Sequence, residues 1–178
     1  MLKSDYPIFK SNDFENLEFK IDEPKIKINI RGKNKDFFTK IGKILSIILP
    51  VEANTSTSNG NLDALWLSPD EWMICLNENI HDNLFNEISK SNLGSVTDVS
   101  DQWISINIRG SKVFDLLSSS SPLDFREFKN KKNYVVQTIL NHVDVTIHHK
   151  ELNDINLFVR RSFSDHLMSW LNDNSRFI

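Results

Sequence analysis

The sequence predicts an α+β protein in which one βαββα unit occurs twice, with antiparallel sheets and helices packed on one face of each sheet. The first observation behind this prediction is an identical pentapeptide, Ile-Asn-Ile-Arg-Gly, at residues 28–32 and again at residues 106–110. The second is that the patterned segments after each copy follow in the same order, at an offset of about 80 residues. Two copies are too few for a solenoid, so we expect a pseudo-twofold domain.

Hydrophobic periodicity locates the elements of the first copy. Isoleucines alternate with polar residues in the first strand, and apolar residues at helical spacing follow a capping Asn34 until Pro50. A loop rich in Ser, Thr and Asn precedes two short strands, and a second helix stops before Gly94. In order, the predicted segments are strand 26–30, helix 37–48, loop 53–61, strands 62–67 and 71–76, and helix 80–88.

The second copy repeats this order of elements. A strand, a helix, a strand pair and a final helix are predicted at residues 106–110, 113–117, 143–148, 155–160 and 163–171.

The domain organisation follows from these segments. Residues 1–21 predict an irregular N-terminal arm, because no apolar period runs through them. Residues 22–178 predict a single domain of two βαββα repeats, about 24–94 and 102–174, with a bridging strand over 95–99.

Composition excludes several classes of protein. The 178 residues carry a formal net charge of −3, whereas a nucleic-acid binder needs a basic surplus to neutralise phosphates. The single cysteine, Cys75, cannot form an internal disulfide and is predicted to be a buried packing residue. With no signal-peptide pattern and no apolar stretch long enough to span a bilayer, we expect a cytoplasmic protein without a membrane segment.

Cofactor and metal motifs are missing from the sequence. The five glycines are scattered, while a flavin or nicotinamide fingerprint needs them clustered at a strand–helix turn. His142 and Asp144 could share a strand face, but two ligands make a poor metal site. We therefore expect no cofactor-binding and no metal-binding residue in this chain.

No catalytic group stands out either. Asp98 and Asp101 flank Ser100 between two predicted strands, where such residues commonly form turns, and a general acid or base would need one of them desolvated. The serines at 118–121 end a helix with no identifiable base beside them. We expect no catalytic residue.

A partner interface is the sharpest site that the residues suggest. An acidic segment beginning at Asp70 and a basic one beginning at Arg160 fall at corresponding points of the two strand pairs. Because Arg and Trp are enriched at binding hot spots, we expect Asp70, Trp72, Arg160 and Arg161 to contact a partner. Solvated strand ends are the alternative.

Four segments give the chain a resemblance to a known family. They are Leu-Ser-Pro-Asp-Glu-Trp at 67–72, Val-Thr-Asp-Val-Ser-Asp at 96–101, Pro-Leu-Asp-Phe at 122–125 and Val-Arg-Arg-Ser-Phe-Ser-Asp-His-Leu at 159–167. In this combination the chain resembles the gamma subunit of heterotetrameric sarcosine oxidase, from roughly residue 62 onward. It departs from that pattern at Ser121, where a cysteine is expected, and near Lys131, where a glycine is expected.

The resemblance implies a non-catalytic, structural subunit. Such a chain packs directly against the alpha subunit of a complex that also holds beta and delta subunits. FAD, FMN, NAD and tetrahydrofolate, together with the oxidative demethylation of N-methylglycine (sarcosine), belong to those partners. The implied fold is similar to the folate-binding domain of the glycine-cleavage aminomethyltransferase.

Two alternatives stay open at this point. The first is the equivalent small subunit of N-methylglutamate dehydrogenase. The second is a standalone folate-binding, aminomethyltransferase-like one-carbon protein, in which Asp98, Asp101 or Asp144 would grip a pterin ring.

Overall fold

The computed structural model describes residues 13–14, 16–22, 25–76 and 81–178. Its contacts divide the chain into two compact units. The first unit is Pro24–Ser100, and the second is Asp101–Ile178 together with the described part of Met1–Glu23. None of the helices in these residues is long and apolar enough to cross a membrane.

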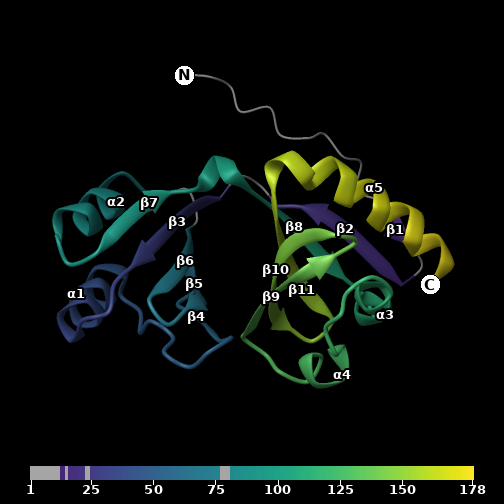
Figure 1. The fold of residues 1–178 in the computed structure, drawn as a ribbon, viewed down its shortest axis with the longest axis horizontal. Helices are drawn as coiled ribbons and strands as arrows, with labels where there is room; N and C mark the ends of the chain where they lie inside the picture. Colours follow the sequence, from purple (N-terminus) through teal and green to yellow (C-terminus); the bar gives the residue numbers. More distant parts are fainter. Residues whose placement is uncertain (1–12, 15, 23–24, 77–80) are drawn as a thin grey trace. The chain divides into compact units, whose positions relative to one another are not determined.

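The first unit is a five-stranded antiparallel sheet with two helices. In chain order its elements are β3 (Ile26–Arg31), α1 (Lys35–Leu45), β4 (Ser56–Ser58), β5 (Leu62–Ser68), β6 (Glu71–Leu76), α2 (His81–Lys90) and β7 (Ser95–Asp98). The strands lie in the order β4-β5-β6-β3-β7. Figure 1 shows α1 and α2 on the same side of these strands.

The second unit is a six-stranded antiparallel sheet, ordered β1-β2-β8-β11-β10-β9. Its strands are β1 (Asp13–Phe14), β2 (Leu17–Ile21), β8 (Trp103–Arg109), β9 (Tyr134–Leu140), β10 (Val143–Glu151) and β11 (Asp154–Arg160). Its helices are α3 (Val113–Ser118), α4 (Phe125–Phe128), η3 (Arg161–Phe163), α5 (Ser164–Asn174) and η4 (Ser175–Phe177), and η2 (Ser100–Gln102) lies at its start.

Four strands occur in the same order in both sheets, which confirms the predicted class of duplicated α+β units with antiparallel sheets. β4, β5, β6 and β3 correspond to β9, β10, β11 and β8. In each unit the strand that follows the first helical segment, β4 or β9, is not part of the predicted βαββα order. β4 lies inside the segment expected to be a loop, because its Ser-Thr-Ser sequence carries no apolar alternation.

The strand that pairs with the other side of β3 or β8 has a different origin in each unit. β7, which follows the first repeat, pairs with β3, whereas β2, which precedes both repeats, pairs with β8. The prediction of an irregular arm up to residue 21 is therefore wrong for Leu17–Ile21. Leu17 and Phe19 are buried in the core of the second unit, so the segment belongs to the sheet that follows it by some 80 residues.

The duplicated pentapeptide makes the same contacts in both units. Arg31 pairs with Glu71 across β3 and β6 (3.8 Å), and Arg109 pairs with Asp154 across β8 and β11 (2.8 Å). Gly32 donates its backbone N–H to the backbone oxygen of Asp70, in the turn between β5 and β6. Gly110 donates in the same way to Asn153, in the turn between β10 and β11. The pentapeptide therefore has the same structural role in both units, since it connects β3 to β6 in one sheet and β8 to β11 in the other.

Each sheet packs one face against its own helices. In the first unit Trp72 and Ile74 of β6 lie against Phe37 and Ile41 of α1, all four fully or almost fully buried. Alternate residues of β6 point to the opposite face, where Met73 and Cys75 are buried too. Burial of each such side chain contributes about 1.5–3 kcal/mol, so these layers supply much of the folding free energy.

Candidate partner interface

Trp72 does not lie on the surface. Its side chain is 0% exposed and packs against the rings of Phe37 and Phe38, with centroids 5.8 and 5.2 Å away. Its indole Nε1–H donates to the backbone oxygen of Pro50 at 2.8 Å. Because a buried indole cannot reach another chain, the expectation that Trp72 contacts a partner is wrong.

Asp70 lies at the turn between β5 and β6 and holds a small charge network. Its carboxylate accepts a hydrogen bond from Ser68 Oγ (2.9 Å) and pairs with Arg31 (3.6 Å) and Lys33 (3.5 Å). The Ser68 hydrogen bond, followed by the charges of Lys33 and Arg31, lowers the pKa of Asp70 below its usual value. The group is therefore a persistent anion between two exposed cations.

Arg160 and Arg161 lie at the end of β11, not at the point of the repeat that corresponds to Asp70. In register, the partner of Arg109 on β11 is Asp154, as Glu71 is the partner of Arg31 on β6. The acidic and basic segments thus occupy opposite ends of equivalent strands.

Around Arg160 the structure builds a cluster that sequence patterns did not indicate. The Arg160 guanidinium lies 4.5 Å from the centre of the Trp103 ring and donates to Gln102 Oε1 at 2.8 Å. Arg161 donates through Nε to the backbone oxygen of Asp101 (2.8 Å) and pairs with its carboxylate (3.2 Å). We call Asp101, Trp103, Arg160 and Arg161 the Arg–Trp cluster. The half-exposed Phe163 follows two residues after Arg161.

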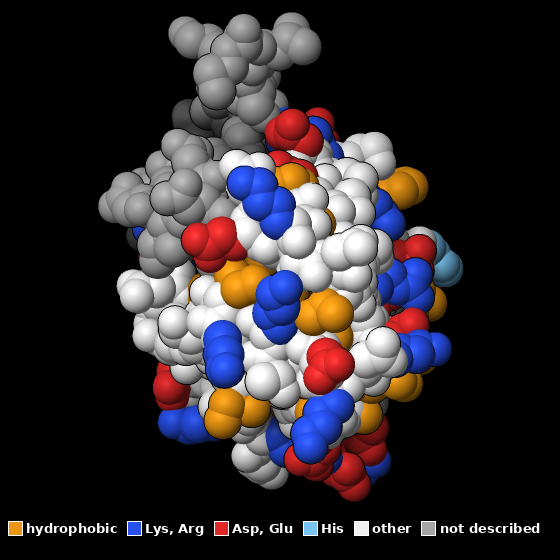
Figure 2. All heavy atoms as spheres, turned by 90° about the vertical axis from the view of Figure 1, so that its left-hand side faces the viewer, with side chains coloured by type: hydrophobic (Ala, Val, Ile, Leu, Met, Phe, Trp, Pro, Cys, Tyr) orange, Lys and Arg blue, Asp and Glu red, His pale blue; other side chains and the backbone are white. Residues whose placement is uncertain are grey.

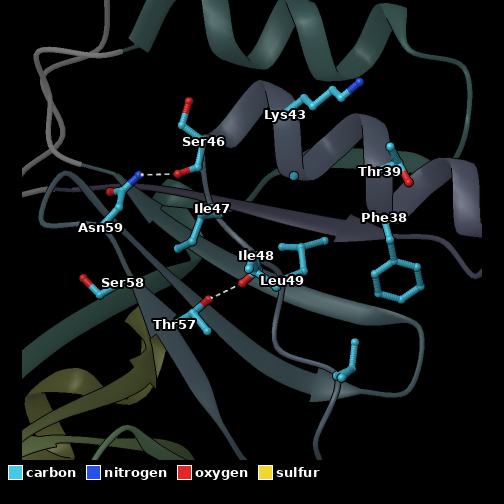
Figure 3. Close-up of a pocket in the computed structure, with 12 residues that line it drawn as sticks. Phe38, Thr39, Lys43, Ser46, Ile47, Ile48, Leu49, Thr57, Ser58 and Asn59 are labelled. Atoms are coloured by element: carbon cyan, nitrogen blue, oxygen red, sulfur yellow. Dashed lines mark hydrogen bonds between the residues drawn. The ribbon is translucent and has the colours of Figure 1, made fainter.

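A second surface feature lies on the first unit, as a groove of about 830 Å³ beside α1 and β4 (Figure 3). Ile48 and Val51 stand at this groove with 84% and 75% of their surfaces exposed. Its lining consists of Phe38, Thr39, Gly42, Lys43, Ser46, Ile47, Ile48, Leu49, Val51, Thr57, Ser58 and Asn59. The sequence gives no signal for it, because apolar residues after a helix end are equally compatible with burial.

Asp98 and Asp101, the two carboxylates that flank Ser100, both have structural partners. Asp98 Oδ1 accepts hydrogen bonds from the Ser100 backbone N–H (2.9 Å) and Oγ–H (2.6 Å), which is the geometry of an Asx turn. Asp101 belongs to the Arg–Trp cluster through Arg161. Within the described residues, no group of three or more His, Cys, Asp or Glu side chains could hold a metal ion.

Solved structures with a similar fold were found for this chain. A chain of the heterotetrameric sarcosine oxidase from Corynebacterium sp. U-96, in complex with pyrrole 2-carboxylate, matches with a TM-score of 0.84 and 19% identity, covering 93% of this chain and 87% of that one. The glycine cleavage system aminomethyltransferase T from Bartonella henselae matches with a TM-score of 0.68 and 14% identity, covering 90% of this chain and 46% of that one. The chain therefore shares the fold of these two proteins and falls in the class of duplicated α+β units with antiparallel sheets.

The family assignment is more specific than the fold. The model of the sarcosine oxidase, gamma subunit family matches residues 31–176, and this chain belongs to that family. Curated proteins gave no match.

Proposed function

We propose that this chain is a non-catalytic structural gamma subunit of a sarcosine oxidase-type complex, which oxidatively demethylates N-methylglycine. The observation that carries the proposal is the match to the gamma subunit family over most of both units. The likeness to a chain of a heterotetrameric sarcosine oxidase supports it.

In this proposal the chemistry resides in the partner chains. The alpha subunit contacts this chain directly, and beta and delta subunits complete the assembly. FAD, FMN, NAD and tetrahydrofolate bind to those subunits, in the cytoplasm, and this chain contributes none of the reacting groups.

The Arg–Trp cluster is the part of the proposed partner interface that lies on the second unit. Stacking on Trp103 holds the Arg160 guanidinium in one orientation, and Asp101 does the same for Arg161, so little side-chain entropy is lost on binding. Phe163 adds a ring whose surface is 50% exposed. Arginine and aromatic side chains are the composition of a binding hot spot. Asp70 contributes a charged contact on the first unit.

The folate-protein alternative has less support. It needs a carboxylate poised in a pocket to grip a pterin ring, but Asp98 is engaged by Ser100 and Asp101 by Arg161. The third candidate, Asp144, is exposed on β10. An N-methylglutamate dehydrogenase small subunit differs from the main proposal only in the amine that the complex oxidises.

Co-expression with the large subunit tests the proposal. The full chain and the alpha subunit are purified together by size-exclusion chromatography, and the absorbance of flavin is recorded across the eluate. Co-elution with a flavin-bearing complex, while this chain alone stays colourless, is the expected result. A separate monomer that binds a folate tightly would overturn it.

Charge reversal then tests the cluster. Arg160→Glu with Arg161→Glu should abolish co-elution, because the two guanidinium groups become repulsive at their contacts. Arg126→Glu is the matched control, since Arg126 is an equally charged and more exposed arginine of the same unit. Co-elution that survives the double reversal would remove the cluster from the interface.

A further inference from the structure

We propose that the groove beside α1 and β4 binds a segment of the larger partner subunit that carries both apolar and acidic side chains. The inference deepens the proposed function and rests on it, since the partner is the large chain of the same complex. It is carried by observations on the first unit alone, independently of the Arg–Trp cluster.

The exposed apolar side chains are not the result of a loose loop. Thr57 Oγ donates to the backbone oxygen of Ile48 at 2.7 Å, and Asn59 Nδ2 donates to the backbone oxygens of Leu45 and Ser46, both at 3.3 Å. Figure 3 shows the Thr57–Ile48 and Asn59–Ser46 bonds, which tie β4 and the residues after it to the segment that follows α1.

The same segment is fixed from the inside. Trp72 donates to the Pro50 backbone oxygen, one residue before Val51, and Leu49 is buried. The helix end itself is closed by Ser46 in the left-handed conformation, with the Ile47 N–H bonded to the Gly42 carbonyl at 3.1 Å. Ile48 and Val51 are therefore held outward on a fixed backbone, and a partner that covers them pays little ordering entropy.

The shape favours a macromolecule over a small molecule. Pockets for small ligands enclose most of the ligand surface. Here the side chains of Ile48 and Val51 are 84% and 75% exposed, so the groove is open to solvent. These two side chains can insert into a complementary surface of a partner. Exposed apolar side chains that gather at one groove mark interaction sites.

The charged side chains around the groove indicate the composition of the partner segment. Lys43 lines the groove, and Lys35 is exposed on the same helix, whose first turn holds the single acid Asp36. Lys40 donates instead to the backbone oxygen of Ser91 after α2. Glu52, just beyond Val51, is the acid on the opposite rim. On the face drawn in Figure 2, which carries α1 and α2, Lys and Arg side chains lie between the hydrophobic ones. A complementary segment places carboxylates against α1 and apolar side chains against Ile48 and Val51.

Three substitutions in the full chain test this placement in the complex with the large subunit. Ile48→Asp and Val51→Asp put a carboxylate into the apolar contact, and Lys43→Glu reverses the charge that faces the acidic segment. Leu152→Asp is the matched control, because Leu152 is 67% exposed on the other unit. Unfolding temperatures of the isolated variants establish that each one folds.

The expected result is a loss of affinity for the large subunit of about tenfold or more for Ile48→Asp and for Lys43→Glu, as at interface hot spots. The Leu152→Asp chain should bind within about twofold of the unmodified one. A carbodiimide, which joins amines to carboxylates without a spacer, should cross-link Lys43 to an Asp or Glu of the large subunit.

The two proposals fail in different ways. If the unmodified chain forms the complex but Ile48→Asp and Lys43→Glu bind equally well and Lys43 yields no cross-link, the groove proposal is overturned and the proposed function stands. If the unmodified chain does not bind the large subunit at all, both are overturned.

Discussion

The side-chain amide of Asn107 donates to the carboxylate of Asp154 across β8 and β11 at 2.7 Å. In the other unit Asn29 donates to Glu71 at 2.6 Å, in the same register. The Asn107 amide also donates to Asn156 Oδ1 (2.8 Å) and the Ile155 carbonyl (3.2 Å). The duplicated Asn therefore ties together the same two strands twice, with more bonds and deeper burial in the second unit.

Replacement of this amide should cost stability unequally in the two units. Asn107→Ala removes the donor to three buried or partly buried acceptors, and we expect a loss of about 1–3 kcal/mol in the free energy of unfolding. Asn29→Ala removes one bond at a partly exposed position, and the loss should be about 1 kcal/mol. Urea unfolding of both variants measures the difference. Equal losses would mean that the additional bonds of Asn107 contribute nothing.

The glycine that ends the second pentapeptide should be intolerant of a side chain. Gly110 has φ +133°, and a Cβ there would overlap the backbone oxygen of Asn16, which leads into β2. Gly110→Ala should lower the free energy of unfolding by at least about 2 kcal/mol, because it combines a rare backbone conformation with a backbone clash. Gly60→Ala is the control, since Gly60 also has a positive φ (+85°) but open space around it. Thermal unfolding of the two variants should separate the clash from the conformational cost.

The regular alternation of apolar residues and the exact pentapeptide repeat made the class of the fold predictable. β3 follows that alternation, and β6 and β11 are mainly apolar runs that recur in the same order after each pentapeptide. β2 was missed because its partner, β8, lies more than 80 residues away, and local patterns carry no information about such pairing.

The interface residues were predictable only in part. Trp72 and Ile74 lie two residues apart, so they share one face of β6, and that face packs into the core. The prediction of a partner contact at Trp72 relied on its residue type and not on this period of two. The Arg–Trp cluster needs Trp103 at the start of β8 beside Arg160 at the end of β11, which is a register contact. The groove depends on hydrogen bonds between the end of α1 with its following segment and residues 9 to 14 positions further along, and no sequence period reports them.

The N-terminal strand should be essential to the second unit. Phe19 is fully buried, packs edge-on against Phe14 with ring centroids 5.8 Å apart, and pairs with Ile108 in register. Phe19→Ala should therefore cost about 3–5 kcal/mol of unfolding free energy. Phe177→Ala, at an 86% exposed position of the same unit, should change it by no more than about 0.5 kcal/mol. Similar effects of the two substitutions in a denaturant titration would show that β2 is dispensable.

The carboxyl of Asp124 should titrate far below its usual range. Its hydrogen bond from the Arg126 side chain, then that from the Arg126 backbone N–H, lower its pKa from 3.8 to about 2. Between these values the folded state binds fewer protons than the unfolded state, so this group's contribution to stability is complete above about pH 4 and is lost as the pH falls towards 2.

Arg126→Ala isolates the side-chain cause of that low pKa. The guanidinium at 2.7 Å from Asp124 Oδ2 is removed, while the backbone N–H of residue 126 still donates to Oδ1 at 2.9 Å. The pKa should therefore rise towards 3.8 without reaching it, because one of the two hydrogen-bonding causes remains. NMR titration of the side-chain carboxyl carbon of Asp124 measures the midpoint directly. Lys33→Ala, which removes a cation from Asp70 only, should leave the midpoint of Asp124 where it was. A midpoint that stays near 2 in Arg126→Ala would assign the whole shift to the backbone hydrogen bond that caps α4.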